Sequence, residues 1–383
     1  MIEACLVGLT GYAQTHLGWI RENQAKGRIR FRSITILPSE QEREADAVAS
    51  LIEEGVKIFS STASMFEEGR GQLQLCFLPT SIASHKTLTL EALEAGCHVL
   101  VEKPLAGSSA EAREIMDARD RYERMVVVGF QDLSRRDIHV IKAGLQEGHW
   151  GNLESINFTA VWPRHHTYYQ RNDWAGKLQH RGLTINDSPA NNATAHYLNM
   201  GLFVAGDQPN LSAEVASVDG DLYRCREIES FDTMSVRFKL NTGLHLRYSV
   251  SHSSSHQLPE ELSFRTDEGE LKVSSRSILW HPRMGAVEDL TVDNVNDGRR
   301  HMVDSLLDHI ENGSSTWPHC SLEIADSHVK AIEKMHEQLT IQTVDEESVI
   351  QSDNITCLQG LDHAMDLARK EGLTFRELDL SFT

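Results

Sequence analysis

The stretch HVLVEKPLAG, residues 98–107, changes abruptly from apolar to charged. Its first four residues have the composition of a buried strand, and Glu102, Lys103 and Pro104 follow at once. Ligands of parallel sheets bind outside the carboxyl ends of the strands, where a cation can stabilise negative charge on a substrate oxygen. The stretch therefore predicts a parallel sheet with a ligand site at its edge. The alternative is a surface Glu–Lys pair at a strand end.

Four more apolar runs surround this stretch, and helical segments separate them. The runs are IEACLVG (2–8), FRSITIL (31–37), QLQLCFLP (72–79) and MVVVGF (125–130). A helix is expected from about Ser84 to Gly96, and a capping box of Ser108 and Glu111 opens another that ends near Tyr122. This alternation predicts an α/β domain, a Rossmann-type doubly wound parallel sheet, over residues 1–130.

The pattern changes after residue 131. A helix over 137–147 is followed by strands that alternate polar and apolar residues, and a helix capped by Ser188 and ended by Gly206 interrupts them. The strand-like runs are 152–162, 232–240, 243–251, 261–266 and 270–275, and later helices are expected over 298–312, 321–339 and 354–371. We therefore predict an α+β domain with a large, mainly antiparallel sheet over 131–340, and a helical tail over 341–383 that packs on the body.

Composition narrows the class of protein. The 37 basic and 56 acidic residues among 383 give a formal charge of −19, which disfavours nucleic acid and anionic membranes as partners. No leader-like or membrane-spanning apolar run is visible, so we expect a cytoplasmic protein. The six cysteines are scattered without CxxC spacing, which favours buried free thiols and predicts no metal site.

The first strand runs into a glycine-containing turn, LVGLTGYAQTH, residues 6–16. In a dinucleotide fold, Gly8, Thr10 and Ala13 would stand at the three glycine positions, and only the first matches. Thr10 puts a side chain where the backbone should approach the phosphate, so Gly11 or the threonine hydroxyl group would have to compensate for it. A plain strand-turn-helix corner is the alternative.

The second strand ends without the usual acidic residue for the adenosine ribose. Pro38 and Ser39 stand there instead, and Ser39 with Arg43 could meet a 2′-phosphate. The expected cofactor is therefore NAD or NADP.

Several motifs now occur together in one order: GLTGYAQTH (8–16), LPTSIASH (78–85), AGCHVLVEKPLA (95–106), VGFQDL (128–133) and a helix with His196. Together they resemble the glucose-fructose oxidoreductase and inositol dehydrogenase family (Gfo/Idh/MocA), over nearly all of the chain up to about residue 340. The resemblance implies that Lys103 reaches between nicotinamide and substrate, with Glu102 near the nicotinamide ribose and Pro104, possible as a cis bond, fixing the bend. The expected cofactor-binding residues are Gly8, Thr10, Gly11, Tyr12, Ser39, Pro79, Thr80, His85, Glu102, Lys103 and Gln131.

A second group of candidates lies on the helix SPANNATAHYLNMG. Asn192, His196 and Asn199 are spaced to project from one helical face. The resemblance implies that His196 exchanges a proton with a substrate hydroxyl, a task suited to an imidazole that titrates near neutrality. Relatives usually carry aspartate where Asn192 stands, and a carboxamide can orient a hydroxyl but cannot take its proton. A histidine that serves only as a satisfied polar residue is the alternative.

The segment between Trp162 and Pro189 is long and rich in aromatic and basic residues. Such loops are usually functional, and this mixture suits a sugar, so Trp174 and Lys177 are our substrate candidates together with Lys103, Asn192 and His196. The adjacent His165 and His166 lack the spacing of metal ligands. The polar run 251–256 is interpreted as a strand end.

These inferences predict an NAD(P)-dependent oxidoreductase that transfers a hydride between nicotinamide and a sugar, polyol or related hydroxy compound. The expected partner is a carbohydrate-like small molecule, and we expect a homo-oligomer, a dimer or tetramer, assembled through the large sheet. Two alternatives stay open: an NAD-dependent glycosidase of the same family, and a non-catalytic sensor of nucleotide or sugar.

Overall fold

The predicted apolar runs of the N-terminal region form one sheet. The computed structural model describes residues 1–352 and 354–382. Its first sheet contains β1 (Ile2–Val7), β2 (Ile29–Thr35), β3 (Lys57–Phe59), β4 (Leu75–Leu78), β5 (His98–Val101) and β6 (Val126–Val128). All neighbours pair in parallel in the order β3-β2-β1-β4-β5-β6, which is the doubly wound arrangement predicted.

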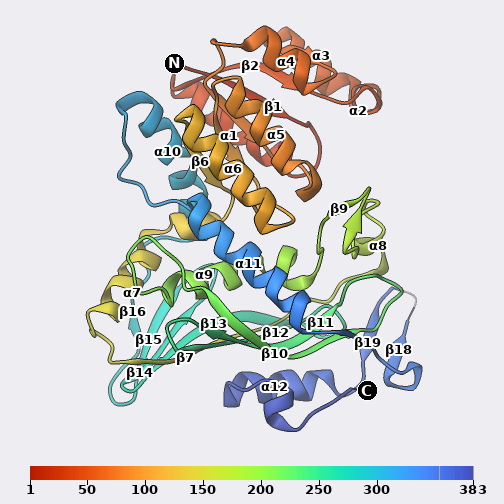
Figure 1. Ribbon diagram of the computed structural model, residues 1–383, viewed down its shortest axis with the longest axis vertical. Helices are drawn as coiled ribbons and strands as arrows, with labels where there is room; N and C mark the ends of the chain where they lie inside the picture. Colours follow the sequence, from red (N-terminus) through yellow and green to blue (C-terminus); the bar gives the residue numbers. More distant parts are fainter. Residues whose placement is uncertain (353, 383) are drawn as a thin grey trace. The chain divides into compact units, whose positions relative to one another are not determined.

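Helices of this region connect the strands as crossovers (Figure 1). They are α1 (Ala13–Ala25), α2 (Pro38–Arg43), α3 (Ala45–Glu53), α4 (Thr62–Gly69), α5 (Ile82–Glu94) and α6 (Ser109–Tyr122). Half of the predicted capping box is present, since the Glu111 N–H donates to Ser108 Oγ over 3.3 Å. Glu111 Oε2 accepts from Gly107 N over 3.1 Å, one residue before the N-cap. Gly96 ends α5 with a φ of 92°, as expected of a left-handed cap.

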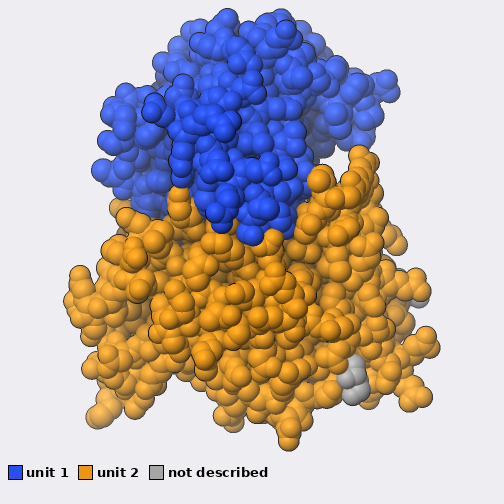
Figure 2. Space-filling model, in the orientation of Figure 1, with its two compact units in different colours: residues 1–134, 297–322 blue, residues 135–296, 323–383 orange. Residues whose placement is uncertain are grey.

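The chain divides into two compact units that interleave along the sequence. Residues 1–134 and 297–322 form unit 1, and residues 135–296 and 323–383 form unit 2 (Figure 2). The sequence interpretation had used consecutive segments. The difference arises because helix α10 (Val295–Asn312) supplies Met302, Val303, Leu306 and Leu307 to the same apolar core as β1 and β2.

Unit 2 is built on a nine-stranded sheet. Its strands are β7 (Leu153–Val161), β10 (Val215–Arg224), β11 (Thr233–Leu240), β12 (His245–Ser251), β13 (Leu258–Thr266), β14 (Gly269–Val273), β15 (Ile278–Pro282), β16 (Glu288–Asp289) and β17 (Ile341–Thr343). The order is β16-β15-β14-β13-β7-β12-β11-β10-β17. Only the β7–β12 and β10–β17 pairs are parallel, so the sheet is mainly antiparallel, as predicted.

The helices of unit 2 include α9 on one face of this sheet and α12 on the other (Figure 1). They are α7 (Arg136–Gln146), α8 (His166–Tyr169), α9 (Ala195–Val204), α11 (Leu322–Gln338) and α12 (Leu361–Glu371), with short η1 (Gln131–Ser134), η3 (Glu346–Ser348) and η4 (Arg376–Leu378) elsewhere in the chain. Two small hairpins add β8 (Gln179–His180) with β9 (Leu183–Thr184), and β18 (Val349–Gln351) with β19 (Thr356–Leu358). Strand β19 occupies part of the predicted 354–371 helix, so that helix begins later than expected.

The predicted helix from Ser188 to Gly206 is in two parts. Ser188 Oγ accepts from Asn191 N over 3.1 Å and caps a π-helical turn, η2 (Pro189–Ala193). Thr194, with φ −112° and ψ 14°, separates this turn from α9. Asn192 and His196 therefore stand on different helical segments, which corrects the expectation of one continuous face.

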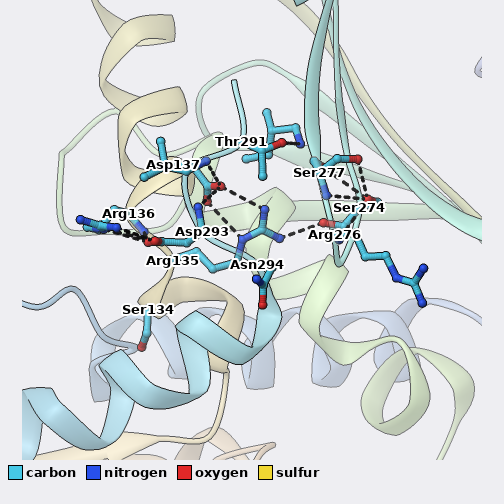
Figure 3. A network of polar contacts seen from close by, with 12 residues as sticks. Ser134, Arg135, Arg136, Asp137, Ser274, Arg276, Ser277, Thr291, Asp293 and Asn294 are labelled. Atoms are coloured by element: carbon cyan, nitrogen blue, oxygen red, sulfur yellow. Dashed lines mark hydrogen bonds and ion pairs between the residues drawn. The ribbon is translucent and has the colours of Figure 1, made fainter. Parts of the chain in front are cut away.

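A buried ionic network ties together the two ends of the 135–296 segment (Figure 3). The fully buried Arg135 donates to Asp137 and to the Ser274 carbonyl. Asp137 Oδ2 also accepts the backbone N–H groups of Val292 and Asp293, and the Asp293 carboxylate accepts from Arg136. Breaking a buried pair of this kind typically costs about 3–5 kcal/mol, so the network fixes the chain where it enters and leaves this segment.

Candidate active site

The carboxyl ends of β1, β4 and β5 lie at one edge of the parallel sheet of unit 1. The turn after β1 contains Gly8 and Gly11, with φ of 91° and 62°, values that favour glycine. A Cβ on Gly8 would contact only Ala13, at 3.8 Å, and a Cβ on Gly11 would have no atom within 4 Å. The turn therefore keeps the open backbone that a dinucleotide phosphate requires.

Thr10, the residue that departs from the glycine pattern, is held by Glu40. Its hydroxyl donates to Glu40 Oε1 over 2.6 Å, and its backbone N–H donates to the same oxygen over 2.8 Å. Leu9 N adds a third bond over 3.3 Å. The Thr10 side chain is thus fixed by α2 through Glu40, and the departure is compensated by a carboxylate and not by Gly11.

An acidic residue, Glu40, does stand a few residues after β2. The residue lies in the first turn of α2 and is 9% exposed, whereas Ser39 and Arg43 are exposed. Sequence reasoning missed Glu40 because it looked for the acid directly at the end of the strand, at Pro38 and Ser39. Helix α2 begins at Pro38, and the acid lies two residues later, in the first turn of that helix. Pro38 at the first helical position was the available signal for that early start.

Glu102 joins the end of β5 to helix α1. Its Oε1 lies 3.0 Å from His16 Nε2, and both groups are buried. Its Oε2 accepts from Lys103 N over 3.2 Å. A Cβ on Gly129 would lie 2.8 Å from the carboxylate, so a larger residue where β6 ends would displace the Glu102 side chain. The peptide bond between Lys103 and Pro104 is cis, as the sequence interpretation had allowed.

His85 binds two loops together. Its Nδ1 lies 2.7 Å from the Pro104 carbonyl and its Nε2 lies 3.1 Å from the Thr80 carbonyl. Burial lowers the pKa of this fully buried imidazole, and the contacts with the two carbonyls partly offset that effect. His85 thus connects the loops that follow β4 and β5.

The other predicted cofactor residues of unit 1 lie near the same edge. Pro79 and Thr80 directly follow β4 and are partly buried. Gln131 begins η1 just after β6 and is 7% exposed. Tyr12 precedes α1, is 41% exposed and packs edge-on against His16, with ring centroids 5.6 Å apart. The predicted set follows strands of a single sheet, and Ser39, after β2, is an exposed member of it.

In unit 2, Asn192 is held by Asp187. Asn192 Nδ2 donates to Asp187 Oδ1 over 2.8 Å, and Asp187 Oδ2 accepts from Gly176 N over 2.7 Å. His196 lies in the first turn of α9 and is partly buried, and Asn199 is fully buried. Sequence reasoning missed Asp187, because a carboxylate five residues before Asn192 has no helical register with it.

The long loop before η2 borders a cavity of about 660 Å³. Lys177, one of the two substrate candidates, lines it together with His166, Tyr169, Arg226 and Glu229. Trp174 is not among the lining residues, and its carbonyl accepts from Lys177 N over 3.1 Å. The Arg171 guanidinium lies 5.0 Å from the Trp174 ring. The cavity walls carry both charges and an aromatic ring, which suits a polar, hydroxyl-rich ligand.

Behind this cavity is a buried polar cluster at the end of β12. His252 Nδ1 lies 2.9 Å from the Tyr169 hydroxyl, and burial lowers the pKa of His252 well below its usual value. Ser253 Oγ donates to Asp232, whose carboxylate also pairs with Arg226. Residues 251–254 of the polar run are therefore a buried strand end that supports the cavity wall, whereas Ser255 and His256 are exposed.

Cysteines and metal ligands add no further site. All six cysteines are free, and all except Cys357 are buried, as predicted. Burial raises the pKa of the Cys5 thiol, which keeps it protonated. Within residues 1–352 and 354–382, no group of three or more His, Cys, Asp or Glu side chains is arranged to hold a metal ion. No helix in that part of the chain has the length and apolar character needed to cross a membrane.

A parallel six-stranded sheet with a glycine-containing turn after its first strand defines the class as a Rossmann-type dinucleotide-binding fold. Residues 2–130 match the family described as "Oxidoreductase family, NAD-binding Rossmann fold" (Gfo/Idh/MocA). The match covers the N-terminal region of the chain, and it confirms the resemblance and the predicted cofactor class, NAD or NADP.

Known relatives agree with this assignment. A curated relative, the uncharacterized oxidoreductase YfiI of Bacillus subtilis, is 27% identical over 119 residues, which span 30% of this chain and 30% of that protein. The WlbA dehydrogenase from Chromobacterium violaceum, solved with NADH and UDP-GlcNAcA, is similar with a TM-score of 0.71 at 21% identity, over 88% of this chain and 93% of that one. The WlbA dehydrogenase from Bordetella pertussis, solved with the same ligands, has a TM-score of 0.71 at 20% sequence identity. The match covers 88% of this chain and 95% of that one. At these identities the structures show a shared fold, which extends through both units.

Proposed function

We propose that the chain is an NAD-dependent oxidoreductase that acts on a hydroxyl group of a sugar or related compound. The observation that carries the proposal is the position of Lys103. It follows β5 at the same sheet edge as the Gly8–Gly11 turn, next to a Glu102 carboxylate anchored on His16. The residues of this edge fit a dinucleotide, because the turn is open and the Thr10 side chain is held by Glu40.

A bound nicotinamide supplies the hydride acceptor. In our proposal the His196 imidazole takes the proton from the substrate hydroxyl, and the Lys103 ammonium stabilises the alkoxide that develops on the same oxygen. Asn192 orients the substrate. Lys103 belongs to unit 1, and Asn192 and His196 belong to unit 2.

The substrate class is inferred from two independent features. The cavity of unit 2 has the mixed polar and aromatic walls that a sugar needs. The two WlbA structures carry a sugar nucleotide, UDP-GlcNAcA, and share the fold of both units. A sugar or sugar nucleotide is therefore the first class to test.

The test has two stages. Thermal-shift measurements with NAD, NADH, NADP and NADPH identify the cofactor, and NADH formation is then followed with UDP-N-acetylglucosamine, D-glucose and myo-inositol. Lys103→Ala and His196→Ala should each lower the turnover by about 10²-fold or more while the NADH-induced thermal shift persists. Wild-type turnover in both variants would contradict the proposal. Sugar release without net NADH would instead favour the glycosidase alternative.

A further inference from the structure

We infer that Asp187 is the positioning residue of this site, because it decides which end of the Asn192 carboxamide faces the substrate. The inference rests on the proposed function, in which Asn192 orients the substrate. The family resemblance implies aspartate at the position of Asn192, and this chain carries asparagine there with a carboxylate five residues earlier. The carboxylate next to Asn192 is therefore that of Asp187.

All contacts of the Asp187 side-chain oxygens given below are with hydrogen-bond donors. The side chain is 3% exposed, Oδ1 accepts from Asn192 Nδ2 over 2.8 Å, and Oδ2 accepts from Gly176 N over 2.7 Å. The Arg171 guanidinium approaches Oδ2 to 3.5 Å. These are the partners of an ionised carboxylate, which can accept hydrogen bonds but cannot donate them.

Because the Asp187 carboxylate can only accept hydrogen bonds, it fixes the orientation of the Asn192 side-chain amide. An asparagine side chain has a donor end and an acceptor end, and a carboxylate can bind only the donor end. Asn192 must therefore turn Nδ2 toward Asp187, and its Oδ1 becomes the end that receives a hydrogen bond from another donor. A second hydroxyl group of the substrate, next to the one that gives its proton to His196, is such a donor, so Asp187 gives Asn192 the polarity needed to hold a hydroxyl-rich substrate.

The same carboxylate connects this chemistry to the cavity wall. Gly176 lines the cavity beside Lys177 and has a φ of 72°, and a Cβ at this position would lie 2.9 Å from Ile228 Cγ2. The backbone of Gly176 is thus held on one side by Ile228 and on the other by Asp187. A ligand that moves the Lys177 segment would act on Asn192 through one carboxylate.

Asp187→Asn tests the polarity directly. The new amide can still accept from Gly176 N through its oxygen, but its NH₂ group then faces residue 192, so Asn192 has to reverse its own amide. We expect the turnover with the best sugar of the panel to fall about 10- to 100-fold, with a smaller change in KM and an unchanged thermal shift by NADH. Asp289→Asn is the matched control, because the exposed Asp289 also accepts one backbone N–H, from Thr291, and should keep wild-type turnover.

The double variant completes the test. Asn192→Asp alone places two carboxylates in contact, so its turnover should acquire a new pH dependence as the pair shares a proton. Asp187→Asn with Asn192→Asp again presents an oxygen to the substrate and should restore turnover to within about 3-fold of wild type. Turnover in Asp187→Asn equal to wild type, or no rescue in the double variant, would overturn the role of Asp187.

A substrate-free measurement separates this inference from the proposed function. The single variants should each lower the midpoint of thermal unfolding by about 2–4 °C, and the double variant should recover at least half of the combined loss. If the losses in the unfolding midpoint of the two single variants simply added up in the double variant, Asp187 would not set the orientation of the Asn192 amide. This result would hold even if the chain oxidised none of the tested sugars. Absence of NADH formation by the wild type would count against the proposed function alone.

Discussion

At the scale of single residues, Glu40 explains how a departure from the glycine pattern is tolerated. Its carboxylate binds Thr10 through both backbone and side chain and places a negative charge beside the phosphate turn. A 2′-phosphate near this carboxylate would be repelled, so the residue favours NAD over NADP. The contact between Glu40 and Thr10 and the preference for NAD cannot be inferred from the sequence, because both depend on where α2 begins.

Glu40→Gln should therefore change the choice of cofactor. The amide keeps an acceptor for Thr10 but removes the charge, so we expect the affinity for NADPH relative to NADH to rise about 10-fold. Titration of both reduced cofactors measures the ratio. Glu42→Gln, an exposed position on the same helix, serves as the control and should leave the ratio unchanged. An unchanged ratio in Glu40→Gln would mean that the carboxylate does not meet the ribose region.

At the scale of elements, the site depends on how the ends of neighbouring strands pack. Gly129 follows β6 and lies against Glu102 at the end of β5. Both strands, and the position of the EKP motif at the end of β5, were predicted from the sequence, because apolar runs and a specific motif are strong signals. It did not predict β3, which has only three residues, or the break at Thr194, which reflects a π-helical turn that periodicity cannot detect.

Gly129→Ala tests this packing. The added Cβ would lie 2.8 Å from the Glu102 carboxylate, so Glu102 must shift and weaken its contact with His16. We expect a loss of about 1–3 kcal/mol in the free energy of unfolding and roughly 10-fold weaker NADH binding. Gly18→Ala is the matched control in α1, where a Cβ meets nothing within 4 Å, and it should stabilise the protein by about 0.5–1 kcal/mol. Equal NADH affinity in both variants would argue against a role for Glu102.

At the scale of the whole chain, segments distant in sequence complete each unit. Helix α10 completes the core of unit 1, and the C-terminal segment completes unit 2 by packing against the nine-stranded sheet. An amphipathic helix shows in the sequence which side is apolar but not which sheet it covers. For this reason the helices near 298–312 and 321–339 were predicted, whereas their assignment to different units was not.

Glu377 fastens the C-terminal segment to the sheet. Its carboxylate accepts from Arg247 Nε over 2.8 Å, from Arg237 Nη1 over 3.0 Å and from Thr374 N over 2.9 Å. Burial raises the pKa of this carboxyl, but the bonds from Arg247 and Thr374 outweigh burial and lower the pKa to about 2. Because the pKa is about 4.3 in the unfolded chain, the stabilisation is complete above that pH and is lost as the pH falls toward 2.

Glu377→Gln should remove this pH-dependent part of the stability. We expect the variant to be less stable than wild type by about 1–2 kcal/mol at pH 7, and the gap to shrink as the pH falls from about 4 toward 2, because wild type then loses the same contribution. Urea unfolding at several pH values measures the gap. Glu371→Gln, at an exposed position on α12, should show no such convergence. A constant gap between wild type and Glu377→Gln would mean that the carboxylate contributes shape and hydrogen bonding but no charge to the attachment of the segment.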